Sequence, residues 1–189
     1  METFLPFILL AIIAISGIFT NIYKNASKEN LVIYGDKNTI WVFRITYPLA
    51  IIMSFTISYS SIGKIQNSAY YFQLFGISFF IIGMIIRWWA ILSLNKEFTV
   101  KISILKNHQL KTTGLYRYIR HPGYTGLILY YFGLGLTLQN GVSILLVFIV
   151  ISLTILLRIS VEEKVLLEHF GYNYRLYSES TKKLIPFIF

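Results

Sequence analysis

Long apolar runs with few charges are the feature that most constrains the fold of this chain. Three of them, residues 4–23, 40–59 and 70–94, each approach the roughly 20 residues that a helix needs to cross about 30 Å of hydrocarbon. Of the 189 residues, 56% are hydrophobic and only 13% are charged, which is far from the averages of soluble domains. The sequence therefore predicts an all-α integral membrane protein.

A fourth apolar region, residues 124–157, is too long for one ordinary span. The turn signal at residues 139–141, Gln-Asn-Gly, interrupts it, so we expect a hairpin of two short antiparallel helices and about five transmembrane helices in total. The first run has only Glu2 before it and lacks the basic region of a cleaved signal, which favours a retained span. Without internal repeats or low-complexity linkers, residues 1–189 are expected to form a single membrane domain.

Lys and Arg residues are distributed unevenly between the loops, and membrane proteins keep such residues on the cytoplasmic side. With the N-terminus outside, fourteen of the seventeen fall in cytoplasmic segments, whereas Lys64 is outside and Arg44 and Arg87 lie within spans. The fourteen are Lys24, Lys28, Lys37, Lys96, Lys101, Lys106, Lys111, Arg117, Arg120, Arg158, Lys164, Arg175, Lys182 and Lys183. We expect a cytoplasmic C-terminus, in the cell membrane of a prokaryote or the endoplasmic reticulum of a eukaryote.

Charge and residue usage exclude several classes of function. The net charge of +9 is what orientation in a membrane requires, and anionic headgroups attract it too, so no nucleic-acid partner is expected. The absence of cysteine removes disulfides, thiolate nucleophiles and Cys-ligated metals. Because His108, His121 and His169 are too dispersed for a metal motif, no metal is expected either.

The connection formed by residues 95–122 is long for a small bundle, and such loops are usually functional or disordered. Its many apolar and aromatic residues argue against disorder, and the polar groups among them suit a ligand pocket. Interfacial anchoring by aromatic and cationic side chains accounts for the same composition, so both interpretations stay open.

The string Arg120-His121-Pro122-Gly123-Tyr124 favours the pocket. Proline keeps the preceding residue extended and suits the first turn of a helix, whose free NH groups and dipole attract electron-rich ligand atoms. His121 and Tyr124 would flank this helix start. Gly123, and Gly126 three residues later, permit close approach either by a ligand or by a neighbouring helix.

Ionisable residues also occur near the ends of the predicted spans. Arg158 and Glu162 are four residues apart, so on a helix they share a face and can pair. Such a pair is often structural, but charges at membrane depth are costly and often mark functional sites, so both roles stay open. For Arg87, a structural pair or a snorkelling side chain is expected.

An ordered set of motifs spans residues 87–189. The motifs are His108-x-Leu110, Gly114-x-Tyr116, Arg120-His121-Pro122-x-Tyr124-x-Gly126, Arg158-x3-Glu162-Glu163, Phe170-Gly171-x2-Tyr174-x2-Tyr177 and Leu184-x-Pro186. This set resembles the isoprenylcysteine carboxyl methyltransferase family. The resemblance implies a membrane enzyme that binds S-adenosylmethionine in a cytoplasm-facing pocket and methylates the carboxylate of a lipophilic substrate such as a prenylated cysteine.

The resemblance also assigns roles to regions and residues. Residues 87–189 would be the catalytic region, with the pocket formed by the 95–122 loop and the C-terminal tail, and residues 1–86 would be anchoring helices. Arg158 would bind the substrate carboxylate and, with Glu162, form the catalytic pair. The implied cofactor contacts are His108, Gln109, Leu110, Lys111, Tyr116, His121, Pro122, Gly123, Tyr124 and Glu162. Lys101 stands where some members have glutamine, and its charge would repel a sulfonium if it pointed inward.

Three other functions fit parts of the pattern. A phospholipid or other lipid-amine N-methyltransferase resembles the same C-terminal motifs, but it needs a proton acceptor and has less use for Arg158. An NADPH-dependent membrane enone or sterol reductase also resembles this region, although the sequence has no Gly-rich phosphate cradle. A non-catalytic transporter or assembly factor is the third, and the scarcity of charges within the spans argues against ion translocation.

Overall fold

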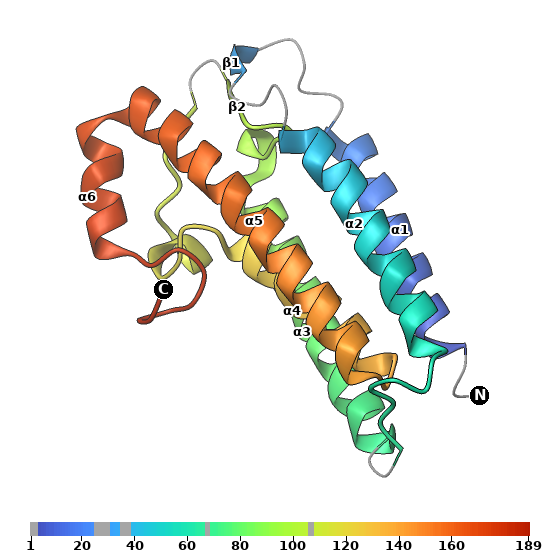
Figure 1. The fold of residues 1–189 in the computed structure, drawn as a ribbon. Helices are drawn as coiled ribbons and strands as arrows, with labels where there is room; N and C mark the ends of the chain where they lie inside the picture. The colour runs from blue at the N-terminus through green and yellow to red at the C-terminus, as the bar shows by residue number, and fades with distance from the viewer. Residues whose placement is uncertain (1–3, 25–30, 35–38, 67–68, 106–107) are drawn as a thin grey trace.

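The computed structural model describes residues 4–24, 31–34, 39–66, 69–105 and 108–189, and shows a bundle of long helices with the loop and tail at one end (Figure 1). The helices are α1 (Leu5–Lys24), α2 (Thr39–Ser58), α3 (Ala69–Leu94), α4 (Pro122–Thr137), α5 (Gly141–Phe170) and α6 (Tyr172–Ser180). Among the described residues, α1, α2, α3 and α5 are long and apolar enough to cross a membrane. The chain is therefore an integral membrane protein.

The three predicted N-terminal spans and the position of the hairpin are confirmed. Among the described residues, however, four helices, not about five, are long enough to cross a membrane, and the two helices of the hairpin differ in length. The hairpin turn lies where it was expected, because the Asn140 side chain accepts a hydrogen bond of 3.1 Å from the Ser143 NH and caps α5. However, α5 is not short: its 30 residues extend about 45 Å, more than the bilayer core requires. Its last turns, beyond the predicted limit at residue 157, therefore project past the hydrocarbon. In contrast, the 16 residues of α4 extend only about 24 Å.

Glycines bring α3 and α4 into close contact along their length. A Cβ atom added to Gly126 would lie 2.6 Å from the backbone nitrogen of Arg87, and one added to Gly83 would lie 2.5 Å from that of Tyr130. Both distances are too short for any side chain larger than hydrogen. Gly126 therefore serves helix packing, whereas Gly123 leaves room for a Cβ atom in ordinary contact with Ala90.

A two-stranded antiparallel sheet, not anticipated in an all-α chain, joins the α1–α2 connection to the long loop. Strand β1 (Leu31–Tyr34) pairs with β2 (Ser103–Leu105), and Tyr34 lies opposite Ser103. The loop also contains two short 3₁₀ helices, η2 (Asn95–Glu97) and η3 (Gly114–Arg117). The sheet therefore links the N-terminal helices to the segment in which the sequence predicts a ligand pocket.

The long loop, α6 and the C-terminal tail lie at the end of the bundle opposite the N-terminus of α1 (Figure 1). This arrangement agrees with the expectation that the loop and the tail share one side of the membrane. That this side is cytoplasmic stays a prediction. Lys28, Lys37 and Lys106, three of the cations on which it depends, lie outside the described residues.

Candidate active site

A cavity of about 390 Å³ lies at the loop end of the bundle. This volume falls within the usual range for small-molecule sites. One group of lining residues comes from the loop and from α4, α5 and α6: Glu97, Lys101, His108, Leu110, Lys111, Tyr116, His121, Gly123, Tyr124, Arg158, Glu162, Tyr174 and Tyr177. A second group lies on α2, α3 and α4: Ile40, Phe43, Tyr47, Arg87, Leu127, Tyr130 and Tyr131. We call the part of the cavity lined by the first group the polar chamber, and the part lined by the second, mainly aromatic and aliphatic group the apolar chamber.

Three side chains form a hydrogen-bonded series where the two chambers meet. The Arg158 Nε donates to the Tyr124 hydroxyl at 2.8 Å, and that hydroxyl donates to the Glu162 Oε2, also at 2.8 Å. Since arginine can only donate, the tyrosine proton must point to the carboxylate. Arg158 therefore acts on Glu162 through Tyr124, where the sequence suggested only a direct pair.

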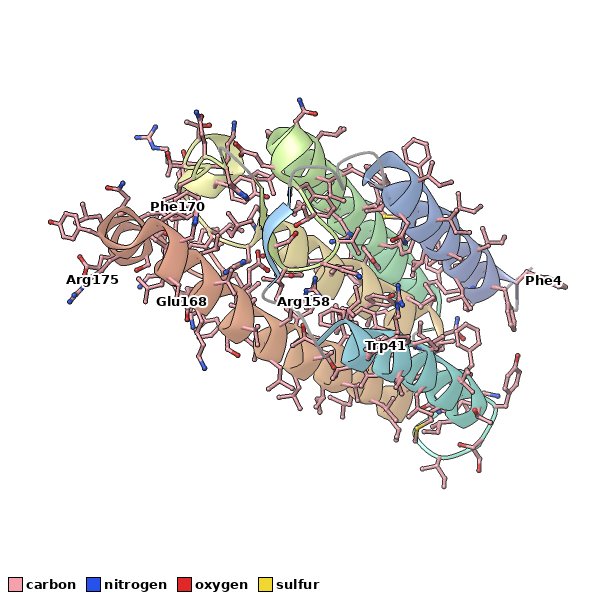
Figure 2. All side chains as sticks on the ribbon, turned by 90° about the horizontal axis from the view of Figure 1, so that it is seen from above. Phe4, Trp41, Arg158, Glu168, Phe170 and Arg175 are labelled. Carbon is pink, nitrogen blue, oxygen red and sulfur yellow. The ribbon has the colours of Figure 1, made fainter. Side chains whose placement is uncertain are left out.

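Arg158 is firmly positioned although it carries a buried charge. It is 6% exposed and points from α5 into the bundle (Figure 2). Its Nη2 donates to the Val100 carbonyl, and its guanidinium carbon lies 5.0 Å from the centre of the Phe43 ring. These contacts link α5 to the loop and to α2, so the guanidinium is held in a fixed direction beside the cavity.

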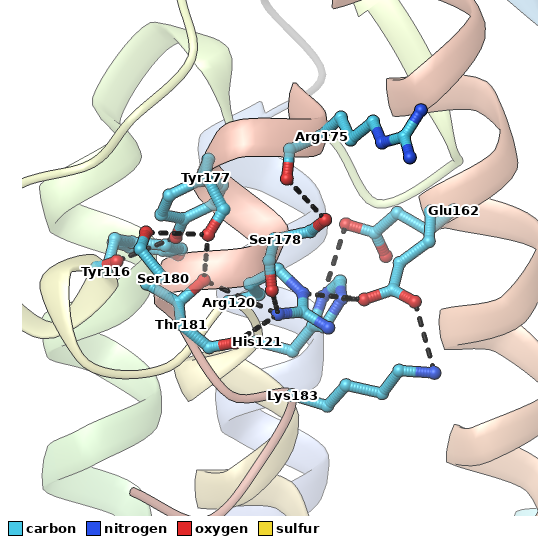
Figure 3. Close-up of polar contacts among 11 residues, drawn as sticks. Tyr116, Arg120, His121, Glu162, Arg175, Tyr177, Ser178, Ser180, Thr181 and Lys183 are labelled. Atoms are coloured by element: carbon cyan, nitrogen blue, oxygen red, sulfur yellow. Dashed lines mark hydrogen bonds and ion pairs between the residues drawn. The ribbon is translucent and has the colours of Figure 1, made fainter. Parts of the chain in front are cut away.

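Glu163, the next residue on α5, anchors the loop and the tail. Its carboxylate lies 2.8 Å from the Arg120 Nε, 3.4 Å from the His121 Nε2 and 3.2 Å from the Lys183 Nζ. Arg120 also donates to the carbonyls of Ser178, at 2.8 Å, and Thr181 (Figure 3). One carboxylate therefore holds the start of α4 and the tail after α6 against α5.

Backbone pairing strengthens the same junction. The Arg120 NH donates to the Lys182 carbonyl at 2.7 Å, and the His121 NH donates to the Lys183 carbonyl at 3.0 Å. Proline at position 122 begins α4 directly after this short extended pair, as the sequence predicts. The His121 ring is thereby fixed at the N-terminus of α4, with its Nδ1 3.9 Å from the Glu162 Oε1.

Tyr116 is held in the polar chamber by its neighbours on two helices. The Tyr177 hydroxyl of α6 donates to the Tyr116 carbonyl at 2.7 Å (Figure 3). The Tyr116 hydroxyl donates to the Ala90 carbonyl of α3 at 3.4 Å. Burial raises the pKa of Tyr177 to about 12, so its hydroxyl keeps the donated proton at neutral pH. The tail therefore shapes the chamber as well as closing it.

His108 presents a buried nitrogen to the chamber. Among the described residues, its Nδ1 has no hydrogen-bond partner, and its ring lies 5.6 Å from that of Phe170. Burial lowers the pKa of His108, although the Glu97 carboxylate opposes this, so the neutral imidazole is favoured. An unpaired polar atom inside a cavity costs free energy unless a ligand or water contacts it.

The structure brings together most of the predicted site residues. Gln109 and Pro122 do not line the cavity: the backbone NH of Gln109 donates to the Glu97 carboxylate at 3.2 Å, and Pro122 is buried in the first turn of α4. Lys101 is exposed but lies at the cavity wall. The remaining predicted residues all line it: His108, Leu110, Lys111, Tyr116, His121, Gly123, Tyr124, Arg158 and Glu162.

Several cavity residues were missing from the predicted site. Tyr174 was quoted within a motif but given no role; its hydroxyl is buried and, within the part of the chain that is described, has no partner. Arg87 lines the cavity and donates to the Gly123 carbonyl at 3.3 Å, so it is part of the wall. Glu97 and Tyr47 carry no local signal, since each reaches the site only through the tertiary fold.

Residues 76–168 match the sequence model of the isoprenylcysteine carboxyl methyltransferase (ICMT) family. Over these residues the chain resembles this family. It is 37% identical over 116 residues to protein-S-isoprenylcysteine O-methyltransferase A of Arabidopsis thaliana, covering 60% of this chain and 59% of that protein. The Schizosaccharomyces pombe protein-S-isoprenylcysteine O-methyltransferase is 32% identical over 119 residues, covering 62% of this chain and 50% of that protein.

The fold agrees with that of a solved ICMT protein. The structure of the eukaryotic intramembrane Ras methyltransferase ICMT superposes with a TM-score of 0.63 and 26% sequence identity, covering 80% of this chain and 54% of that one. The chain thus spans between half and three fifths of the length of these relatives. All the predicted site residues fall inside the family match, whereas α1, α2 and α6 fall outside it.

Proposed function

We propose that this protein is an S-adenosylmethionine-dependent methyltransferase that esterifies the carboxylate of a lipophilic substrate, such as a prenylated cysteine. The observation that carries the proposal is the Arg158–Tyr124–Glu162 series where the polar and apolar chambers meet. A group that binds carboxylates is thereby held between a chamber suited to a polar cofactor and one suited to a lipid tail. The match of residues 76–168 to the ICMT family supports the same reaction.

The polar chamber fits the chemistry of S-adenosylmethionine. The unpaired His108 Nδ1 and the Tyr174 hydroxyl offer hydrogen bonds to a polar ligand, and Tyr116 and His121 add aromatic surface. Glu162 can accept ribose hydroxyls or oppose the positive charge of a sulfonium. We assign His108, Leu110, Lys111, Tyr116, His121, Gly123, Tyr124 and Glu162 to this chamber, with Lys101 at its rim and Gln109 and Pro122 supporting its backbone. When bound, the cofactor supplies an electrophilic methyl group.

Arg158 is assigned to the acceptor. A carboxylate with a pKa near 3 to 4 is already ionised at neutral pH, so the protein needs no general base and has mainly to hold the nucleophile in line. The guanidinium can bind both carboxylate oxygens and fix their direction. A lipid amine would instead have to lose a proton and would be repelled by this cation, which favours an acidic acceptor.

The N-terminal helices complete the apolar chamber. Ile40 and Phe43 of α2 line it, as does Gly17 of α1, so residues 1–86 supply a wall for the lipid tail as well as anchorage. Residues 87–189 then form the catalytic region. In this proposal the N-terminus is outside, and the loop and tail face the cytoplasm.

Calorimetric titration of the detergent-purified protein with S-adenosylhomocysteine tests the cofactor, and methyl transfer to N-acetyl-S-farnesylcysteine tests the acceptor. Saturable binding followed by a base-labile methyl ester is the expected result. Binding without ester formation, but with methylation of a phospholipid amine, would replace the acceptor class. Absence of binding in a folded sample would overturn the proposal, and NADPH oxidation would then point to a reductase.

A further inference from the structure

One buried hydroxyl in the apolar chamber has no partner. Among the described residues, the Tyr47 hydroxyl on α2 is inaccessible to solvent and makes no hydrogen bond, although the residue lines the cavity. Burying a hydroxyl without a hydrogen-bond partner costs free energy. A phenylalanine would fill the same space without that cost. The presence of the hydroxyl therefore indicates that it forms a hydrogen bond with a bound ligand.

The hydroxyl lies next to the group assigned to the acceptor. Phe43, whose face Arg158 covers at 5.0 Å, has its ring centre 4.7 Å from that of Tyr47. On the other side, Tyr47 meets the edge of Tyr131 at 5.2 Å between ring centres. It thus stands one helical turn deeper than Phe43, on the membrane side of the guanidinium.

We propose that Tyr47 is a positioning residue whose hydroxyl donates a hydrogen bond to the acceptor carboxylate together with Arg158. A carboxylate has about four acceptor sites and a guanidinium fork fills two, which leaves room for a donor from the membrane side. A neutral donor suits this depth, since it avoids the cost of a second buried cation. The inference rests on the proposed function and assigns a substrate contact to α2, outside the segment that matches the family.

The position also bears on substrate selection. In this proposal Tyr47 and Arg158 donate to different oxygens of the carboxylate, whereas a carboxamide presents an NH2 group in place of one of these oxygens. A carboxamide would therefore set a donor against one of these two donors and leave it unpaired. Such a site discriminates by leaving buried groups unsatisfied in the wrong complex.

The test compares Tyr47→Phe with wild type and with Tyr71→Phe, which removes a hydroxyl from an exposed tyrosine on α3. Kinetics with N-acetyl-S-farnesylcysteine should show KM raised about tenfold in Tyr47→Phe, with kcat changed less than threefold. S-adenosylhomocysteine affinity should stay unchanged, and thermal stability without the acceptor should rise slightly in Tyr47→Phe, because the variant no longer buries an unpaired hydroxyl. In competition binding, the preference of wild type for this acid over its carboxamide should fall about tenfold.

Other outcomes separate the two proposals. An unchanged KM and unchanged acid preference in Tyr47→Phe, with an active wild type, would overturn the role of Tyr47 alone. Equal weakening of acid and carboxamide binding would also overturn it, because the hydroxyl would then contact another part of the ligand. If wild type neither binds nor esterifies the acid, the proposed function fails first and the inference falls with it.

Discussion

Two neighbouring glutamates on α5, Glu162 and Glu163, belong to clusters that differ in whether the carboxylate faces the cavity or is paired within the protein. Glu162 receives the Tyr124 hydroxyl and faces the cavity, where part of its hydrogen-bonding capacity is open to a ligand. Glu163 is enclosed by Arg120, His121 and Lys183, and its contacts join α5 to the start of α4 and to the tail. We call these the cavity cluster (Arg158, Tyr124 and Glu162) and the anchoring cluster (Glu163, Arg120, His121 and Lys183).

The difference shows how one helix, α5, can carry both side chains that face a ligand and side chains that hold the fold together. Successive residues on a helix point about 100° apart, so adjacent glutamates reach different surroundings without any change in the backbone. The cavity cluster keeps charges available for a ligand, whereas the anchoring cluster uses its charges within the protein. His121 lies close to both glutamates, so it connects the two clusters.

Arg158→Gln is expected to give the largest effect, and on catalysis rather than on the cofactor. Removing the guanidinium takes away the charged, two-point contact with the acceptor carboxylate, so kcat/KM should fall about 100- to 1000-fold. S-adenosylhomocysteine affinity, measured by calorimetry, should change less than about threefold.

Arg175→Gln provides the matched control. Arg175 lies on α6 in a solvent-exposed pair with Glu179, so the same substitution there should leave kcat/KM unchanged. If Arg158→Gln kept more than a tenth of the wild-type kcat/KM, the assignment of the cavity cluster to the acceptor would be wrong.

Glu163→Gln should act on stability instead. Arg120 would lose its carboxylate partner while staying largely buried, which costs about 2–4 kcal/mol by the usual behaviour of broken buried ion pairs. Denaturation in detergent should detect this loss, and affinity for cofactor and acceptor should fall together because both depend on the docked tail. The corresponding Glu162→Gln variant should keep its stability and lose cofactor affinity.

Comparing Glu162→Gln with Glu163→Gln tests directly whether the two clusters have different roles. Glu179→Gln, at the exposed pair on α6, controls for loss of a surface charge and should cost less than about 0.5 kcal/mol. Equal loss of stability in Glu162→Gln and Glu163→Gln would mean that the two clusters do not divide chemistry from architecture.

Sequence reasoning succeeded where the signal is local. Apolar runs placed α1, α2 and α3 within a residue or two of their observed limits, and the turn before Gly141 placed the hairpin. It underestimated α5 because the charges after residue 157 were taken as the end of the span, whereas the helix continues outside the hydrocarbon to Phe170. A charged segment can leave the membrane without ceasing to be a helix.

Contacts between segments far apart in the chain could not be predicted from the sequence. The pairing of Tyr34 with Ser103 joins strands of three or four residues, too short to show a period of two. Likewise, the i,i+4 spacing suggested that Arg158 pairs with Glu162, but it could not reveal that Tyr124 of α4 stands between them. Tyr47 reaches the cavity only because α2 packs against α5.

The smallest expected effect concerns His108 and pH. Because burial holds its folded-state pKa below the usual 6.5, the unfolded chain binds this proton more readily. The stability that neutral His108 contributes is therefore present above about pH 6.5 and is lost as pH falls below that value. The difference in melting temperature between wild type and His108→Asn should shrink from pH 7.5 to pH 5.5, by less than the change caused by Glu163→Gln.

Adding S-adenosylhomocysteine turns this pH effect into a test of the polar chamber. If the His108 Nδ1, which has no partner among the described residues, accepts a hydrogen bond from the ligand, binding favours the neutral ring further. Affinity should then fall as pH drops through the lowered pKa of His108 in wild type, but not in His108→Asn. Affinity that rises in acid would instead mean that a protonated ring binds an anionic group of the ligand. Identical pH profiles for the two proteins would remove His108 from the cofactor site and leave the polar chamber to Glu162 and the tyrosines.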